Sequence, residues 1–285
     1  MNYRPADFAG SWYPSNRSDC LKAIEDYIKS GPPCPEDGKE AVGGIVPHAG
    51  WYFSGKIACN VIKCLGEGSP PDTVILFGRH LHSGSPNYIM EAGEWETPLG
   101  FLKIDGELSR RITVEFSFSL ETTDSYEQDN TIELQLPFVK YFFPQTMILP
   151  VGLPPKPSSL EIGKRIAEIG QSLGRKMVVI GSTDLTHYGY NYGFTPKGTG
   201  KAAVEWVKYE NDRQMIDLML SMDAKRVIDE ARRNFNACCG GAVAAAISAV
   251  KQIGAISASE LIYSTSYDVR PDSSFVGYAG IVFKK

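Results

Sequence analysis

The sequence lacks the features that mark membrane, secreted or nucleic-acid-binding proteins. None of its apolar runs approaches the roughly 18–20 residues that a membrane-spanning helix needs. No basic region followed by an apolar stretch opens the 285-residue chain, so we expect no secretory signal and a cytoplasmic location. The 29 basic and 33 acidic side chains give a net charge of −4, which provides no electrostatic footprint for nucleic acid. We therefore expect neither membrane nor nucleic acid among its partners.

Cysteine is scarce, and none of the six cysteines forms the CxxC pair typical of structural zinc sites. In a reducing cytoplasm we expect all six to be thiols, with Cys59 and Cys64 in the core of a helix. Cys238 and Cys239 are adjacent, a spacing that suits neither a disulfide nor a zinc knuckle. We expect Cys238 to pack as a small apolar residue. Cys239 is the better functional candidate, because it precedes a predicted helix whose N-terminus lowers a thiol pKa.

Apolar runs of strand length alternate with helical segments, which predicts an α/β protein. Four runs are apolar throughout, as in parallel strands covered by helices on both faces: 42–46, 73–77, 147–151 and 177–180. Helices are expected at about 20–29, 56–65, 131–143, 160–173, 201–220, 223–233 and 241–253, a loop at 31–39, and final strands at 260–267 and 274–283. No linker divides the chain, so we expect one domain over residues 1–285.

The chain has only four histidines, and each follows one of the predicted buried strands. His48 follows the first, His80 and His82 follow the second, and His187 follows the fourth. Because ligands of open α/β sheets bind beyond the carboxyl ends of the strands, we expect these imidazoles to share one site. For any one histidine, a hydrogen-bonded loop residue is the competing interpretation. Imidazoles gathered in a crevice indicate a metal, acid–base catalysis, or both.

Other polar residues near these strand ends have two interpretations each. Asp184 could orient an imidazole, bind a cation, or cap a helix. Arg79 could pair with an anionic substrate or form a surface salt bridge. Glu133 could orient a histidine, but we interpret it as an acid on a helix surface. Ser182, Asp184 and His187 together permit the hypothesis of a metal-free or zinc hydrolase, which is weakened because no GxSxG elbow precedes a helix.

Six short motifs resemble those of a known family and follow its order along the chain. They are GSWYP (10–14), PHAGW (47–51), IELQLPF (132–138), STDLTHYG (182–189), CG (239–240) and SSFVGYAG (273–280). This set resembles the Memo family, whose prokaryotic members are called AmmeMemoRadiSam system protein B. The resemblance implies an α/β/α sandwich with a central, mostly parallel or mixed sheet. It further implies similarity in fold to class III extradiol dioxygenases, which use non-haem iron.

The resemblance also implies a set of metal ligands. These are His48, Cys239 and one of the two histidines after the second strand. The family motif places that histidine three residues after a glycine, where this chain has Leu81. We therefore keep both His80 and His82 as candidates and prefer His80.

The family's catalytic histidine corresponds to His187, with Asp184 in the same motif, whereas Asn130 stands where the family usually has a histidine. The implied metal is iron(II) or copper, ahead of zinc. A thiolate ligand is softer than a carboxylate, which argues against simple transfer of ring-cleavage chemistry. We expect a metal-dependent oxidoreductase, or alternatively a non-catalytic metal- or peptide-binding protein. The expected partners are a small molecule or peptide and, from the family name, radical-SAM and AMMECR-type proteins.

Overall fold

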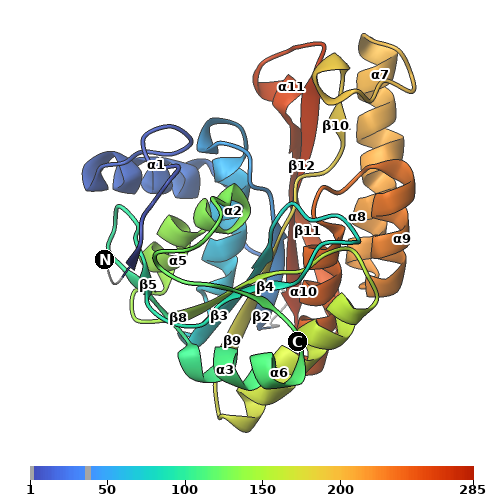
Figure 1. The fold of residues 1–285 in the computed structure, drawn as a ribbon. Coiled ribbons are helices and arrows are strands. Elements are labelled where there is room, and N and C mark those ends of the chain that lie inside the picture. The colour runs from blue at the N-terminus through green and yellow to red at the C-terminus, as the bar shows by residue number, and fades with distance from the viewer. Residues whose placement is uncertain (1–2, 36–39) are drawn as a thin grey trace.

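The computed structural model describes residues 3–35 and 40–285, so residues 36–39 of the expected loop lie outside it. Within the described residues, twelve strands form a mixed sheet (Figure 1). The strands are β1 (Tyr3–Arg4), β2 (Ala41–Val46), β3 (Thr73–Gly78), β4 (Tyr88–Met90), β5 (Glu94–Trp95), β6 (Leu102–Ile104), β7 (Ser119–Glu121), β8 (Met147–Gly152), β9 (Met177–Ser182), β10 (His187–Tyr188), β11 (Ser257–Thr265) and β12 (Phe275–Lys284). The helices are α1 (Arg17–Ser30), α2 (Trp51–Leu65), α3 (Gly106–Glu115), α4 (Asn130–Glu133), α5 (Leu136–Phe142), α6 (Ser158–Ser172), η1 (Tyr190–Tyr192), α7 (Lys201–Trp206), η2 (Val207–Asn211), α8 (Asp212–Leu220), α9 (Ala224–Asn234), α10 (Gly240–Ile253) and α11 (Ser266–Val269).

The centre of the sheet is parallel, in the order β6-β8-β3-β9-β2. The hairpin β11–β12 adds antiparallel strands beside β2. The four strands predicted from fully apolar runs are β2, β3, β8 and β9, and they form the middle of this sheet. The α/β prediction is therefore confirmed, with a mixed sheet whose centre is parallel.

Both faces of the central sheet are buried, which explains why its strands are apolar throughout. Along β3, Val74 and Leu76 pack into the core beneath α1, α2 and α5. Ile75 and Phe77 point the other way, into the core formed with α3, α6, α8, α9 and α10. Figure 1 shows these two groups of helices on opposite sides of the sheet. Successive strand residues face opposite layers, so each layer receives its own set of side chains.

Two expected helices are interrupted. The segment at 131–143 divides into α4 and α5, where Pro137 occupies the first turn of the second helix. Proline has no backbone N–H to continue a helix but fits its first turn. The segment at 201–220 contains the π-helical turn η2 between α7 and α8. Among the described residues, no helix combines the length and apolarity needed to cross a membrane.

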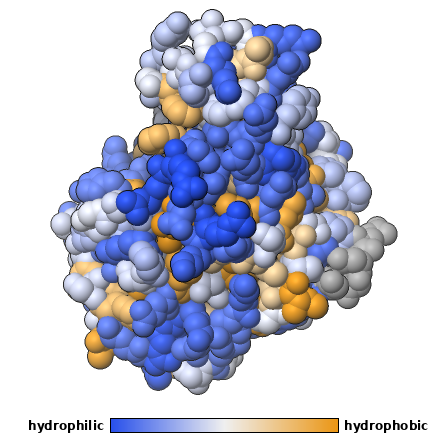
Figure 2. All heavy atoms as spheres, turned by 90° about the vertical axis from the view of Figure 1, so that its right-hand side faces the viewer, coloured by the Kyte–Doolittle hydropathy of each residue, from blue (hydrophilic) through white to orange (hydrophobic). Residues whose placement is uncertain are grey.

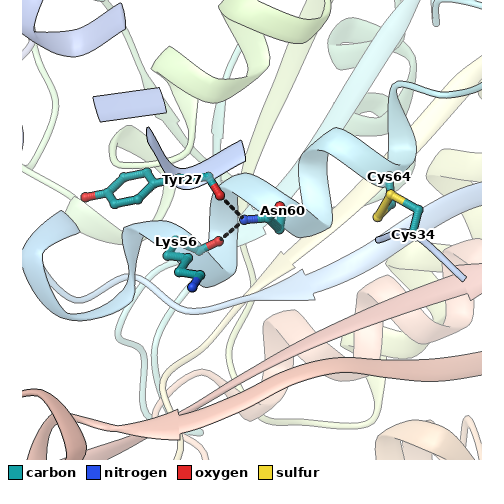
Figure 3. Close-up of a disulfide and its surroundings, with 5 residues drawn as sticks. All are labelled: Tyr27, Cys34, Lys56, Asn60 and Cys64. Carbon is teal, nitrogen blue, oxygen red and sulfur yellow. Dashed lines mark hydrogen bonds between the residues drawn. A yellow bond between two sulfur atoms is a disulfide. The ribbon is translucent and has the colours of Figure 1, made fainter. Parts of the chain in front are cut away.

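The expectation of six free thiols is wrong, because Cys34 and Cys64 form a disulfide (Figure 3). Cys64 lies in the last turn of α2, and the chain after α1 returns there, so the two Cα atoms are 5.4 Å apart. This separation suits a disulfide. Asn60, one turn earlier, donates its Nδ2 to the carbonyls of Tyr27 and Lys56 and ties α2 to α1. The 30-residue spacing of the cysteines carries no sign of this pairing in the sequence.

Candidate metal centre

Three neighbouring parallel strands end at one edge of the sheet, and each delivers a polar side chain two residues later. His48 follows β2, His80 follows β3 and Asp184 follows β9. Cys238 and Cys239 reach the same place from the segment that enters α10. One ligand atom from each histidine and each cysteine lies within 4.8 Å of the others. We call His48, His80, Cys238 and Cys239 the His/Cys cluster.

The spacing of the His/Cys cluster fits a single metal ion. His48 Nε2 lies 3.1 Å from His80 Nε2 and 3.2 Å from Cys238 Sγ. The two Sγ atoms are 3.6 Å apart. A tetrahedral metal with nitrogen at about 2.0 Å and sulfur at about 2.3 Å holds its ligand atoms roughly 3.3–3.8 Å apart. The side chains therefore stand close to the positions that a shared ion requires.

The hydrogen bonds of His48 fix which nitrogen faces the cluster. Ser182 Oγ donates to the carbonyl of Thr131 at 2.7 Å, which uses its only proton. The contact of 2.9 Å between Ser182 Oγ and His48 Nδ1 must then be donated by His48. In the neutral imidazole, Nε2 consequently carries the lone pair and points at His80 and Cys238. This is the tautomer that a metal ligand needs.

The cluster is also electrostatically polarised. Burial disfavours a charged His48, but the Asp184 carboxylate and Cys238 outweigh burial and raise the pKa of His48 to about 9. Burial also opposes a thiolate at Cys238, yet the hydrogen bond from Cys239 and the charge of His48 hold the Cys238 pKa well below its usual range. Burial and the neighbouring Cys238 raise the pKa of Cys239. The group thus combines a thiolate with an imidazolium, whose proton a cation would displace.

Asp184 and His187 lie beside the cluster. Asp184 Oδ1 accepts the backbone N–H of His48 at 2.8 Å, and its other oxygen lies 3.9 Å from His48 Nε2. Burial raises the pKa of Asp184. His187 Nδ1 lies 3.1 Å from the carbonyl of Leu185, which can only accept, so neutral His187 keeps Nε2 free to take a proton. His187 lines a pocket of about 670 Å³ together with His48, His80 and Asp184.

The structure separates the two histidines that follow β3. His80 is in the cluster, whereas His82 is exposed and its Nδ1 accepts the backbone N–H of Gly84. The turn between strand and ligand is formed by Arg79, which is buried and has a φ of 74°. Its guanidinium binds Glu121 and Glu127 at 2.6 and 2.7 Å. Arg79 is therefore part of a structural ion-pair network and is not available to an anionic substrate.

Cys238 is the functional candidate that the sequence interpretation assigned to packing. Its Sγ accepts the backbone N–H of Asp184 at 3.3 Å and lies against His48. The adjacent Cys238–Cys239 pair was the available signal, because both thiols reach one site when the chain turns into α10. Asn130, where the resemblance implies a histidine, donates to the carbonyl of His48 at 3.0 Å and lines the pocket.

Glu133 lies away from the cluster and is buried, so its assignment to a helix surface is wrong. Its carboxylate accepts the backbone N–H groups of Asp7 and Phe8 and the hydroxyl of Tyr13. The segment held in this way continues to Trp12, which lines the pocket. Glu133 therefore positions a pocket wall from a distance.

Comparison with known proteins places these features in a family. A family model described as Memo-like protein matches residues 4–282. A MEMO1 family protein of Pyrococcus furiosus is 36% identical over 294 residues, covering 99% of each chain. One of Methanopyrus kandleri is 34% identical over 297 residues, covering 100% of each. The crystal structure of an uncharacterized Escherichia coli K12 protein aligns with a TM-score of 0.48 at 9% identity, covering 84% of this chain and 99% of that one. The chain belongs to the Memo family.

Proposed function

We propose that this protein is a metal-dependent oxidoreductase whose His/Cys cluster holds one iron(II) or copper ion. The observation that carries the proposal is the convergence of two imidazole and two thiol ligand atoms within 4.8 Å, at the edge where three parallel strands end. Imidazole and thiolate ligands together favour copper, iron or zinc over magnesium or calcium. A redox-active ion bound there supplies electron-transfer chemistry to a substrate in the adjoining pocket.

The surrounding residues have defined roles in this proposal. Ser182 keeps Nε2 of His48 turned toward the ion, and Asp184 fixes the His48 backbone. His187 acts as general acid–base, because its free Nε2 borders the pocket that the cluster also lines. Tyr192 contacts the edge of the His187 ring at a centroid distance of 5.0 Å and holds it in place.

The second candidate function is a non-catalytic metal-binding protein, and Cys238 is the observation that favours it. Catalytic zinc sites keep a position open for water or substrate, whereas structural sites close it with a fourth protein ligand. Cys238 supplies such a ligand in addition to His48, His80 and Cys239. The hydrolase hypothesis loses support, because Ser182 is buried, does not line the pocket and donates its proton to the carbonyl of Thr131.

The test is anaerobic purification followed by elemental analysis and titration with Fe(II), Cu(I) and Zn(II). We expect one metal per chain in the wild type, and its loss in His48→Ala and Cys239→Ser. The matched control is His82→Ala, which removes an exposed imidazole outside the cluster and should retain the metal. Equal metal content in all four proteins would refute the proposed site.

Catalysis is tested separately by oxygen consumption with aromatic and redox substrates. The oxidoreductase predicts turnover that falls at least a hundredfold in His187→Ala while metal content stays unchanged. Stoichiometric metal without turnover on any substrate supports the second candidate. Cys238→Ser should lose metal affinity in both candidates, because Cys238 belongs to the His/Cys cluster in each, so turnover is the measurement that separates them.

A further inference from the structure

A second pocket, of about 600 Å³, reaches the His/Cys cluster from another side. His187 and Tyr192 line both pockets and so form the partition between them. The imidazoles of His48 and His80 line the first pocket, whereas the thiol side of the cluster lines the second pocket at Cys238. The cluster therefore lies at the junction of two spaces.

The second pocket differs from the first in chemistry. Its walls include the apolar side chains of Leu81, Pro155, Phe194 and Phe235. The charged side chain among its lining residues, Arg232, is exposed. Small-molecule pockets typically have volumes of about 300–1,000 Å³ and mostly apolar walls with a few polar groups. Size and lining thus fit the apolar part of a small molecule.

Phe235 is the unusual wall residue. It follows α9 in the left-handed conformation, with φ 51° and ψ 36°, and its side chain is 64% exposed. A bulky residue is strained in that conformation and persists there only where its surroundings impose it. Here Asn236 imposes it, because its buried side chain donates to the carbonyl of Asn211 and to Glu230. The ring centroids of Phe235 and Phe194 lie 5.5 Å apart, so the two rings form one part of the pocket wall.

The surface on this side of the molecule favours a small ligand over a protein partner. Figure 2 shows the side of the molecule that carries α8 and α9, and it is mostly hydrophilic with hydrophobic atoms in small separate areas. A large contiguous apolar patch is one mark of a protein-interaction site, and this view shows none. The exposed ring of Phe235 is accordingly better explained by a small ligand that enters the pocket beside it.

We propose that the second pocket is a substrate subsite that binds a neutral apolar ring, with the substrate hydroxyl directed to His187. The Nε2 of neutral His187 is an acceptor that such a hydroxyl can use. This inference rests on the proposed function, because it names the class of substrate for the proposed oxidoreductase. Its physical basis is the lining of Phe194, Phe235 and Leu81 beside Cys238.

The test uses metal-free protein, so that it does not depend on the metal proposal. Binding of benzyl alcohol, 4-ethylbenzyl alcohol and 4-butylbenzyl alcohol is measured by ligand-observed NMR. We expect the affinity to rise roughly threefold to fourfold for each methylene that is buried. In Phe235→Asn the butyl compound should bind at least about tenfold more weakly. Asparagine tolerates the left-handed conformation, so this variant keeps the backbone.

The matched control is Tyr52→Ala, which removes an exposed ring from the first pocket and should leave the series unchanged. Equal affinity for all three alcohols would overturn the subsite. So would a loss of affinity in Tyr52→Ala that Phe235→Asn does not show. If the three alcohols bind with the expected rise in affinity but the protein binds no metal, only the proposed function is refuted. If the protein binds metal but the three alcohols bind with equal affinity, only the subsite is refuted.

Discussion

Glu133 provides the most quantitative prediction, because it is a buried carboxyl that titrates near neutral pH. Burial is the main cause, and it raises the Glu133 pKa from 4.5 to about 7 despite three hydrogen bonds to the carboxylate. A carboxyl with a raised pKa binds its proton more tightly in the folded state than in the unfolded state. Folding stability must therefore increase as the pH falls from 7 toward 4.5, and decrease as the pH rises through 7.

The magnitude follows from the two pKa values. A shift of about 2.5 units corresponds to about 3.4 kcal/mol over the full titration. Between pH 8 and pH 5, the same pKa values give a gain of about 2.5 kcal/mol from this one group. Glu133→Gln retains the shape of the side chain but removes the titration. Relative to Glu133→Gln, the wild type should therefore gain about 2.5 kcal/mol in free energy of unfolding when the pH falls from 8 to 5.

The assay is urea unfolding followed by tryptophan fluorescence at pH 5, 6, 7 and 8. Other groups also titrate in this range, so the measured quantity is the difference between wild type and variant at each pH. The control is Glu67→Gln at an exposed position, whose free energy of unfolding should change with pH in the same way as that of the wild type. If the difference between wild type and Glu133→Gln stays constant within about 0.5 kcal/mol, the argument from burial is wrong. The same experiment concerns the site, because Glu133 anchors the segment that carries Trp12 to the pocket.

Three further perturbations have expected outcomes. Gly277→Ala should destabilise folding by about 3 kcal/mol or more in urea unfolding, because its Cβ would overlap Oδ2 of the buried Asp212. Wild-type stability in this variant would contradict the prediction. Replacing both Cys34 and Cys64 by alanine should cost about 3–4 kcal/mol, since their disulfide closes a 30-residue loop; unchanged thermal unfolding would show that it does not constrain the unfolded chain. Ser182→Ala should weaken metal binding roughly tenfold to a hundredfold in a chelator competition, because it removes the oxygen that orients the ligand imidazole, and unchanged affinity would argue against that role.

The arrangement of the site shows why the adjacent thiols matter. Cys239 is at the N-cap of α10 and is buried, whereas Cys238 borders the second pocket. The same short segment, from Phe235 to Cys239, thus carries the strained aromatic wall and both thiols of the His/Cys cluster. A ligand that displaces Phe235 would act on the loop that positions Cys238.

The sequence by itself determined the α/β class, the four central strands and the position of three of the four histidines, His48, His80 and His187, around one pocket. These features follow from local patterns: continuous apolar runs mark strands buried on both faces, and parallel strands end at the same edge. His48 and His80 were predictable because each lies two residues after such a strand. Helices α1, α2, α6, α9 and α10 were predictable because the spacing of apolar residues that marks a helix is also a local feature of the sequence.

Only the tertiary structure decided the remaining features, because they depend on contacts between residues far apart in the chain. The choice of His80 over His82 depends on the left-handed turn at Arg79, which is held by Glu121 at the end of β7 and Glu127 in the loop that follows. The disulfide, the burial of Glu133 and the inclusion of Cys238 in the cluster likewise depend on where α2, the N-terminal segment and α10 pack. Spacing along a chain does not encode such distances, since they are set by how side chains fill the space between helices and sheet.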